Sequence, residues 1–212
     1  MGSARASRAV FGALAELDFP SEQLDCRKSS RLRRRNRPHA RRVRLPRPNI
    51  VKKVNLKEIK EEPWQSPRGK YAAYFKGISE ALGRDPTSLN LAKRHPFDLE
   101  ITRVPVGKCN FPYHAHSAQW ELYLVISGRG DVRHEDGKTE VVAGDAFIFA
   151  PNEPHQLSNS GTEDLVYYVV ADNPIGESAY FPDSGKWKVN KSSSSDRVVV
   201  KGKEADYFDG EE

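Results

Sequence analysis

The stretch WELYLVISGRGDVRHEDGKTEVVAGDAFIFA, residues 120–150, decides the fold that the sequence predicts. It consists of short apolar runs separated by turn residues. The first run ends at Gly128–Gly130, and Gly144–Asp145 leads into the run Ala146–Phe149. Between them, Asp136–Gly137 indicates a two-residue hairpin turn, because both central positions of that turn need positive φ. Short strands that recur at such intervals predict an antiparallel sandwich or barrel.

The same pattern extends on both sides of this stretch. Phe97, Leu99 and Ile101 alternate with polar residues, which is the period of a half-buried strand. Ser160–Gly161 marks another turn before the apolar residues of 165–170. The sequence therefore predicts an all-β fold, with the sandwich or barrel at residues 97–190.

Residues 50–96 give mixed signals and are expected to form an arm that packs on the barrel. Within this range, apolar residues at helix-like spacings run from residue 71 to residue 82. Gly83 follows that run and could end a helix, whereas Gly77 in the middle of the run weakens the prediction of a helix. A short helical segment and an apolar loop therefore both stay open. The apolar residues at helix-like spacings are Tyr71, Tyr74, Phe75, Ile78 and Leu82.

The end of the chain is expected to be a linker and an acidic tail, residues 191–212. Residues 180–189 hold aromatic side chains and a turn, which should pack back on the barrel. A short strand at Val198–Val200 could pair with an exposed sheet edge.

The positive charge of the chain belongs to its N-terminal segment. Residues 1–49 hold thirteen basic and four acidic residues, a net charge of +9, whereas the rest carries −4. The Arg-rich segment has few apolar residues and no period, so we expect a disordered extension. Three interpretations stay open: an arm that contacts nucleic-acid phosphates, a transit peptide, against which the four acids count, or a segment foreign to the natural protein. Elsewhere the charge gives no attraction for nucleic acid.

Composition limits the remaining classes. Hydrophobic residues are 37% and charged residues 30% of the 212 residues, which still allows one modest core. No apolar run approaches the roughly 18 residues of a membrane span, so no membrane protein is expected. With only Cys26 and Cys109, free thiols in a reducing, cytoplasmic compartment are expected; one long-range disulfide between them is the alternative.

Three histidines and one glutamate form a candidate metal site. His114 and His116 alternate within an extended segment and therefore point to one face, about 7 Å apart. Glu121 would face the other way unless residues 117–119 bend the chain, and His155 follows a proline-bounded turn at 151–154. Three imidazoles and a carboxylate suit Mn, Fe(II), Ni, Co or Zn and do not choose among them.

These residues stand in a pattern that resembles the two motifs of the cupin superfamily, over residues 107–170. The pattern is Gly107-x6-His114-x-His116-x4-Glu121-x6-Gly128, followed by Gly144-x6-Pro151-x3-His155-x3-Asn159. It departs from the family at two positions, both in loops. Six residues instead of the usual five separate Gly107 from His114, and Glu153 stands where the family usually has glycine. The resemblance implies a jelly-roll β-barrel, a homodimer and one divalent metal bound by His114, His116, Glu121 and His155. Asn159 is interpreted as structural.

Further residues are candidates for the surroundings of the site. Tyr123 and Val125 share the face of Glu121, and Tyr123 could donate a proton, orient a ligand or simply fill the core. Phe149 and Tyr168 are further pocket candidates. Gln119 could fix an imidazole, and Trp120, on the other face, should pack under residues 71–82.

The sequence thus predicts a cupin that binds or acts on a small molecule, of sugar or carboxylic-acid type, at a divalent metal inside the barrel. If it is an enzyme, the resemblance implies an isomerase, an epimerase or a dioxygenase; the alternative is a non-catalytic module that binds or senses a ligand. No cluster of Lys or Arg is expected inside the barrel, which counts against sugar phosphates. Nucleic acid would bind only through the basic N-terminal segment.

Overall fold

The computed structural model describes residues 51–88, 90–190 and 197–209, and the expectations for residues 1–49 and for the linker at 191–196 lie outside this part. The described chain is mostly β-strand, as predicted. The helices are single turns, α1 at Ile78–Ala81 and α2 at Leu91–Arg94. The strands are β1 Glu62–Gln65, β2 Ala72–Gly77, β3 Phe97–Val104, β4 Ala115–His116, β5 Glu121–Ser127, β6 Arg129–His134, β7 Gly137–Val142, β8 Ala146–Phe149, β9 Gln156–Ser158, β10 Leu165–Asp172, β11 Ala179–Phe181, β12 Lys186–Asn190 and β13 Arg197–Val200.

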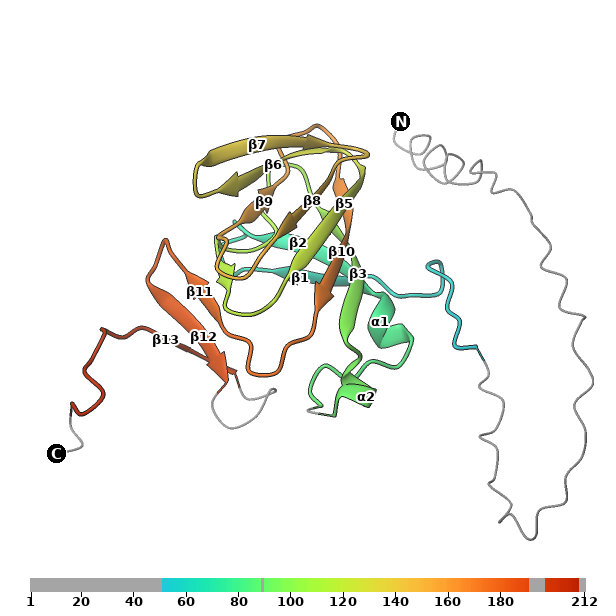
Figure 1. The fold of residues 1–212 in the computed structure, drawn as a ribbon. Coiled ribbons are helices and arrows are strands. Elements are labelled where there is room, and N and C mark those ends of the chain that lie inside the picture. The colour runs from blue at the N-terminus through green and yellow to red at the C-terminus, as the bar shows by residue number, and fades with distance from the viewer. Residues whose placement is uncertain (1–50, 89, 191–196, 210–212) are drawn as a thin grey trace, which may run out of the picture. The chain divides into compact units, whose positions relative to one another are not determined.

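Two antiparallel sheets enclose the core (Figure 1). One has the strand order β1-β2-β3-β10-β5-β8, and the other has the order β7-β6-β9. Leu165 and Tyr167 of β10 meet Val132 of β6 and Leu157 of β9 in one buried cluster. Along β10 the buried residues alternate with more exposed ones, which is the period expected of a strand with one face on a core.

The hairpin of β6 and β7 forms where the sequence predicts it, but its turn differs. His134 pairs with Gly137, so the two loop residues are Glu135 and Asp136. Of these positions only Gly137 has positive φ, at +136°. The Asp-Gly signal therefore located the turn correctly and placed its centre one residue too late.

The helix-like spacing at residues 71–82 was misleading. Residues 72–77 form strand β2, which pairs with β3, and only one helical turn follows. Ala73 is fully buried and Phe75 packs on the core, whereas Tyr74 faces outward with the Arg103 guanidinium 3.9 Å from its ring centre. Pairing satisfies the backbone groups at the edge of β3, and this long-range gain outweighs the local spacing.

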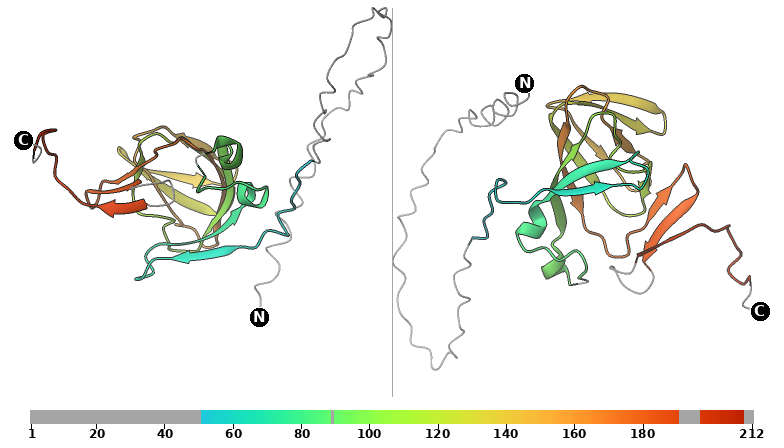
Figure 2. Two further views of the ribbon diagram at one scale, coloured as in Figure 1. Left: turned by 90° about the horizontal axis from the view of Figure 1, so that it is seen from below. Right: turned by 180° about the vertical axis from the view of Figure 1, so that it is seen from behind.

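A four-stranded sheet, β13-β12-β11-β4, carries the C-terminal part. The expected strand at Val198–Val200 does form within β13, and it pairs with β12. The views in Figures 1 and 2 place the two helices on one side of the sandwich and the β12–β13 hairpin on another. In the part of the chain described, no helix has the length and apolar character of a membrane span.

Candidate metal centre

The four residues of the sequence motif come together in the structure. One side-chain nitrogen or oxygen from each of His114, His116, Glu121 and His155 lies within 4.8 Å of all the others. The backbones of His114 and His155 exchange two hydrogen bonds, of 3.2 and 2.8 Å, which brings the two motifs side by side. His116 lies on β4, and Glu121 begins β5.

A bend at residues 117–119 turns Glu121 toward the histidines, and the carboxylate of Glu177 stabilises this bend. Glu177 accepts hydrogen bonds from the backbone N–H groups of Ser117 and Ala118, at 3.1 and 2.9 Å. It also lies 3.1 Å from Nδ1 of His116. Glu177 is 5% exposed, so burial would favour its neutral form, but these bonds outweigh burial and lower its pKa.

Glu177 therefore has the role that the sequence analysis gave to Gln119. Gln119 instead donates to the backbone oxygen of Asp172, at 2.6 Å. Trp120 is 48% exposed, so the prediction that it packs under residues 71–82 is wrong. Glu177 stands in the loop before β11, far along the chain from the bend, and no local signal marks it.

The outer nitrogens of two of the three rings fix which tautomer those rings adopt. Nδ1 of His114 lies 2.9 Å from the backbone oxygen of Pro112, and Nδ1 of His155 lies 3.0 Å from that of Glu153. A carbonyl oxygen can only accept, so both Nδ1 atoms carry the proton. In a neutral ring the lone pair is then on Nε2, which is the atom directed into the cluster.

In this tautomer Nε2 of His114 and of His155 carries no proton, and the Tyr123 hydroxyl lies 3.3 Å from Nε2 of His155. Nε2 of His116 is buried, has no hydrogen-bond partner among the described residues and lies 3.5 Å from Oε1 of Glu121. Nε2 of His155 lies 2.9 Å from Oε2 of Glu121. Two acceptors at that distance repel unless a proton or a cation lies between them.

The charges of the cluster are arranged accordingly. Burial, with the nearby His155 and His116, lowers the pKa of His114 to about 3, so that this ring is neutral. Burial alone would raise the pKa of Glu121, but the neighbouring imidazoles of His155 and His116 favour the charged carboxylate and lower it to about 2. For His116 burial acts downward, and the Glu177 bond and the nearby carboxylates outweigh it and raise the pKa. The cluster thus presents a carboxylate among imidazole nitrogens.

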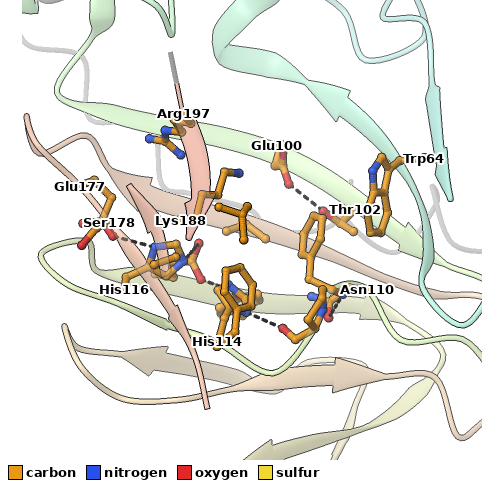
Figure 3. Close-up of a pocket in the computed structure, with 18 of the residues that line it drawn as sticks. Trp64, Glu100, Thr102, Asn110, His114, His116, Glu177, Ser178, Lys188 and Arg197 are labelled. Carbon is orange, nitrogen blue, oxygen red and sulfur yellow. Dashed lines mark hydrogen bonds and ion pairs between the residues drawn. The ribbon is translucent and has the colours of Figure 1, made fainter. Parts of the chain in front are cut away.

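A cavity of about 470 Å³ adjoins the cluster (Figure 3). Tyr123 lines it, as predicted for that face of β5, and its hydroxyl donates to Glu121 at 2.6 Å. The other lining residues include apolar side chains of the core and of the C-terminal strands. The full lining is Trp64, Glu100, Thr102, Asn110, Phe111, Pro112, His114, His116, Glu121, Tyr123, Tyr167, Val169, Glu177, Ser178, Ala179, Phe181, Lys188, Arg197 and Val199.

Two predicted pocket residues lie elsewhere. Tyr168 points away from the cavity, because the inward face of β10 belongs to Tyr167 and Val169. Phe149 stacks on the ring of His155, with the centroids 4.1 Å apart, and so supports a candidate ligand from outside the cavity. Asn159 is structural, as predicted: it is buried and its Nδ2 donates to two backbone oxygens at 2.8 Å.

Besides Glu177, three charged residues that line the cavity were missed. Lys188 and Arg197 line it from β12 and β13, whereas the sequence predicted no cluster of Lys or Arg inside the barrel (Figure 3). Glu100 faces it from β3 and accepts a hydrogen bond from the Thr102 hydroxyl at 2.9 Å. Burial is the main cause that raises the pKa of Glu100 to about 7. The signal in the sequence that could have found Glu100 is the period of two along β3, which puts it on the same inward face as Thr102 and Val104.

Comparisons with known proteins agree with this geometry. The family model described as a cupin domain matches residues 100–171. The chain is 36% identical over 76 residues to an uncharacterized protein of Methanocaldococcus jannaschii, and 32% identical over 69 residues to an oxalate-binding protein of Thermotoga maritima. These matches cover 36% and 32% of this chain, and the chain spans only 60% and 55% of the lengths of the two relatives.

Solved structures show the same fold. A crystal structure of a sugar phosphate isomerase from a cupin superfamily of Silicibacter pomeroyi has a TM-score of 0.58 at 20% identity, over 70% of this chain and 92% of that one. A protein of Acidithiobacillus ferrooxidans, assigned provisionally as a sugar phosphate isomerase, has a TM-score of 0.58 at 21% identity, over 68% of this chain and 86% of that one. At these identities the likeness concerns the fold alone.

Proposed function

We propose that this chain, which belongs to the cupin superfamily through its domain at residues 100–171, binds one divalent transition-metal ion and presents it to a small molecule in the adjoining cavity. The proposed ligands are His114, His116, Glu121 and His155. The observation that carries the proposal is the tautomer pattern: acceptors hold Nδ1 of His114 and His155, so their Nε2 lone pairs face the carboxylate of Glu121, to which the Tyr123 hydroxyl donates a single hydrogen bond. A cation resolves this arrangement, and the donor set suits Mn, Fe, Ni, Co or Zn.

Elemental analysis of the purified protein tests the proposal. The expected content is about one divalent ion per chain in the wild type, and at least about tenfold less at equal free metal in His114→Ala or His155→Ala. His134→Ala is the matched control, because His134 lies on β6 with its Nε2 3.0 Å from the Thr139 hydroxyl, outside the cluster. Unchanged occupancy in the two cluster variants would reject the site.

The ligand is proposed to be a small molecule of carboxylic-acid or sugar type. When bound, a divalent ion of this kind supplies Lewis acidity to a carbonyl, hydroxyl or carboxylate oxygen. The cavity of about 470 Å³ is of a size for such a molecule. The curated relative from Thermotoga maritima that is described as oxalate-binding supports the carboxylic-acid class. Binding without turnover is the simplest form of this proposal.

A second candidate function is proton-transfer catalysis, of isomerase or epimerase type. Glu100 favours it, because a cavity carboxyl with a pKa of about 7 can both take and return a proton near neutral pH. Dioxygenase chemistry has no comparable support among the cavity residues described. Turnover of sugars, keto acids and phenols by metal-replete protein, with oxygen consumption recorded, distinguishes these cases. Glu100→Gln should abolish isomerisation and leave the metal content unchanged; equal turnover in this variant would exclude the role.

The proposed assembly is a homodimer through the outer face of the larger sheet. Ile148, Leu122, Val170 and Leu99 are direct cross-strand neighbours, so they form one apolar row across β8, β5, β10 and β3. Ile148 is 52% and Leu122 41% exposed in the single chain. Contiguous exposed apolar surface of this kind marks an interface, and the row runs along a face that a second copy can match.

Sedimentation equilibrium tests the assembly. Ile148→Glu should convert the dimer to a monomer, because it places a carboxylate on the most exposed residue of the row, at its β8 end. Val142→Glu is the matched control, since Val142 is similarly exposed but lies on β7 of the other sheet. A wild-type protein that is monomeric at micromolar concentration would reject this assembly.

A further inference from the structure

The C-terminal strands bring two cations to the cavity that adjoins the histidine cluster. Lys188 lies on β12 and Arg197 begins β13, and the two residues line the same cavity (Figure 3). We propose that Lys188 and Arg197 form an anion-binding subsite, so that the ligand of the cavity carries a carboxylate or phosphate group besides the oxygen that faces the cluster. The claim that the ligand faces a metal rests on the proposed function. The claim that it carries an anionic group rests only on the two cations.

The two cations have no carboxylate partners among the residues described. Elsewhere in that part of the chain, Arg103 forms ion pairs with Glu61 and Asp164, and Arg133 forms one with Asp183. Neither Lys188 nor Arg197 forms an ion pair with a described acidic residue. Two like charges in one cavity are unfavourable, and a bound anion would remove that cost.

The electrostatics of the neighbours agree with this geometry. Burial, followed by the charge of Arg197, lowers the pKa of Lys188. The positive charge of Arg197 therefore acts on Lys188, as expected of two cations that line the same cavity.

The acidic residues of the cavity do not neutralise these cations. Glu121 is engaged by His155 and by the hydroxyl of Tyr123. Glu177 is engaged by His116 and by two backbone N–H groups. Glu100 accepts a hydrogen bond from the Thr102 hydroxyl, and because burial raises its pKa to about 7, a large fraction of it is protonated and uncharged at pH 7. A positive end of the cavity thus remains for the ligand.

Calorimetric titration of the metal-loaded full-length protein tests the subsite with matched pairs of probes. Succinate is compared with succinamide, and glucose 6-phosphate with glucose; inorganic phosphate is titrated alone. At least one anionic probe should bind about tenfold or more tightly than its neutral partner, since a charge-assisted hydrogen bond contributes a factor of this order. The pair that shows the preference identifies carboxylate or phosphate as the anchored group.

Variants locate the effect. Lys188→Met and Arg197→Met should each weaken the preferred anion by about tenfold or more, and Lys188→Arg should keep most of the affinity. Lys186→Met is the matched control: it removes an equal charge from the same strand, but Lys186 is exposed and does not line the cavity. Thermal melting of each variant shows that it is folded.

The outcomes separate this inference from the proposed function, because metal content is measured on the same samples. Equal affinity for anionic and neutral probes, binding of none of them, or full anion affinity in both methionine variants would overturn the subsite. If metal content is normal in that case, only the subsite fails. Anion preference in protein that binds no metal would keep the subsite and reject the metal site.

Discussion

Replacing Glu100 by Gln should make the protein more stable at pH 8 and leave its stability at pH 4 nearly unchanged. Glu100 lies at the cavity on β3, and burial raises its pKa from 4.5 to about 7. A raised pKa means that the folded state binds the proton more tightly than the unfolded state does. The contribution to stability is therefore full below pH 4.5 and is lost as the pH rises from about 4.5 to 7.

The magnitude follows from the size of the shift. A rise of one in the pKa corresponds to about 1.4 kcal/mol, so ionising Glu100 costs the folded state at most about 3.5 kcal/mol above pH 7. Because the side chain is only partly shielded from solvent, we expect about 1–3 kcal/mol. Gln keeps an oxygen that can accept from the Thr102 hydroxyl and carries no charge, so it avoids this cost.

Urea unfolding of wild type and Glu100→Gln at pH 4 and pH 8, with metal removed by a chelator, measures the difference. At pH 8 the variant should gain about 1–3 kcal/mol, or roughly 2–4 °C in Tm per kcal/mol. Glu62→Gln is the control, since Glu62 is exposed on β1 and should change stability by less than about 0.5 kcal/mol. A loss of stability at pH 8, or a difference independent of pH, would refute the reasoning.

Three further predictions concern the centre and its support. Glu177→Gln should weaken metal affinity by about 10–100-fold in a chelator competition, since Glu177 orients His116 and the bend; equal affinity would exclude that role. Metal content should fall as the pH drops through roughly 6, because protons compete for His116, whose pKa is raised, and full occupancy at pH about 4 would contradict this. Asn159→Ala should cost about 2–4 kcal/mol in urea unfolding through three lost hydrogen bonds while metal content stays the same; a loss of metal in a folded variant would contradict a purely structural role.

The strands of the sandwich could be predicted because their sequence pattern and their environment agree. Along β5, the inward positions of Tyr123 and Val125 alternate with exposed leucines, and along β3 the buried Thr102 alternates with more exposed neighbours. The paired motifs also predicted which four side chains would meet. In each case, one face of a strand lies on the core, and the period of two follows directly.

The parts that the sequence missed depend on contacts between distant segments. β2 is a strand because β3 offers it an edge, although its apolar residues repeat at a helical spacing. Glu177 and Arg197 reach the site only through the pairing of β11 with β4 and of β13 with β12. Tyr168 was placed on the wrong face because Tyr167 and Tyr168 are adjacent aromatics, and register alone decides which one points inward.

The claim on which the rest depends is that the Nε2 atoms of three neutral rings and the carboxylate of Glu121 surround one cation. A crystal structure of the purified protein, with diffraction recorded at the absorption edge of the metal found by elemental analysis, tests it most directly. We expect one anomalous peak about 2.0–2.3 Å from Nε2 of His114, His116 and His155 and from an oxygen of Glu121. A cluster without a peak, in crystals grown with that metal at saturating concentration, would contradict it.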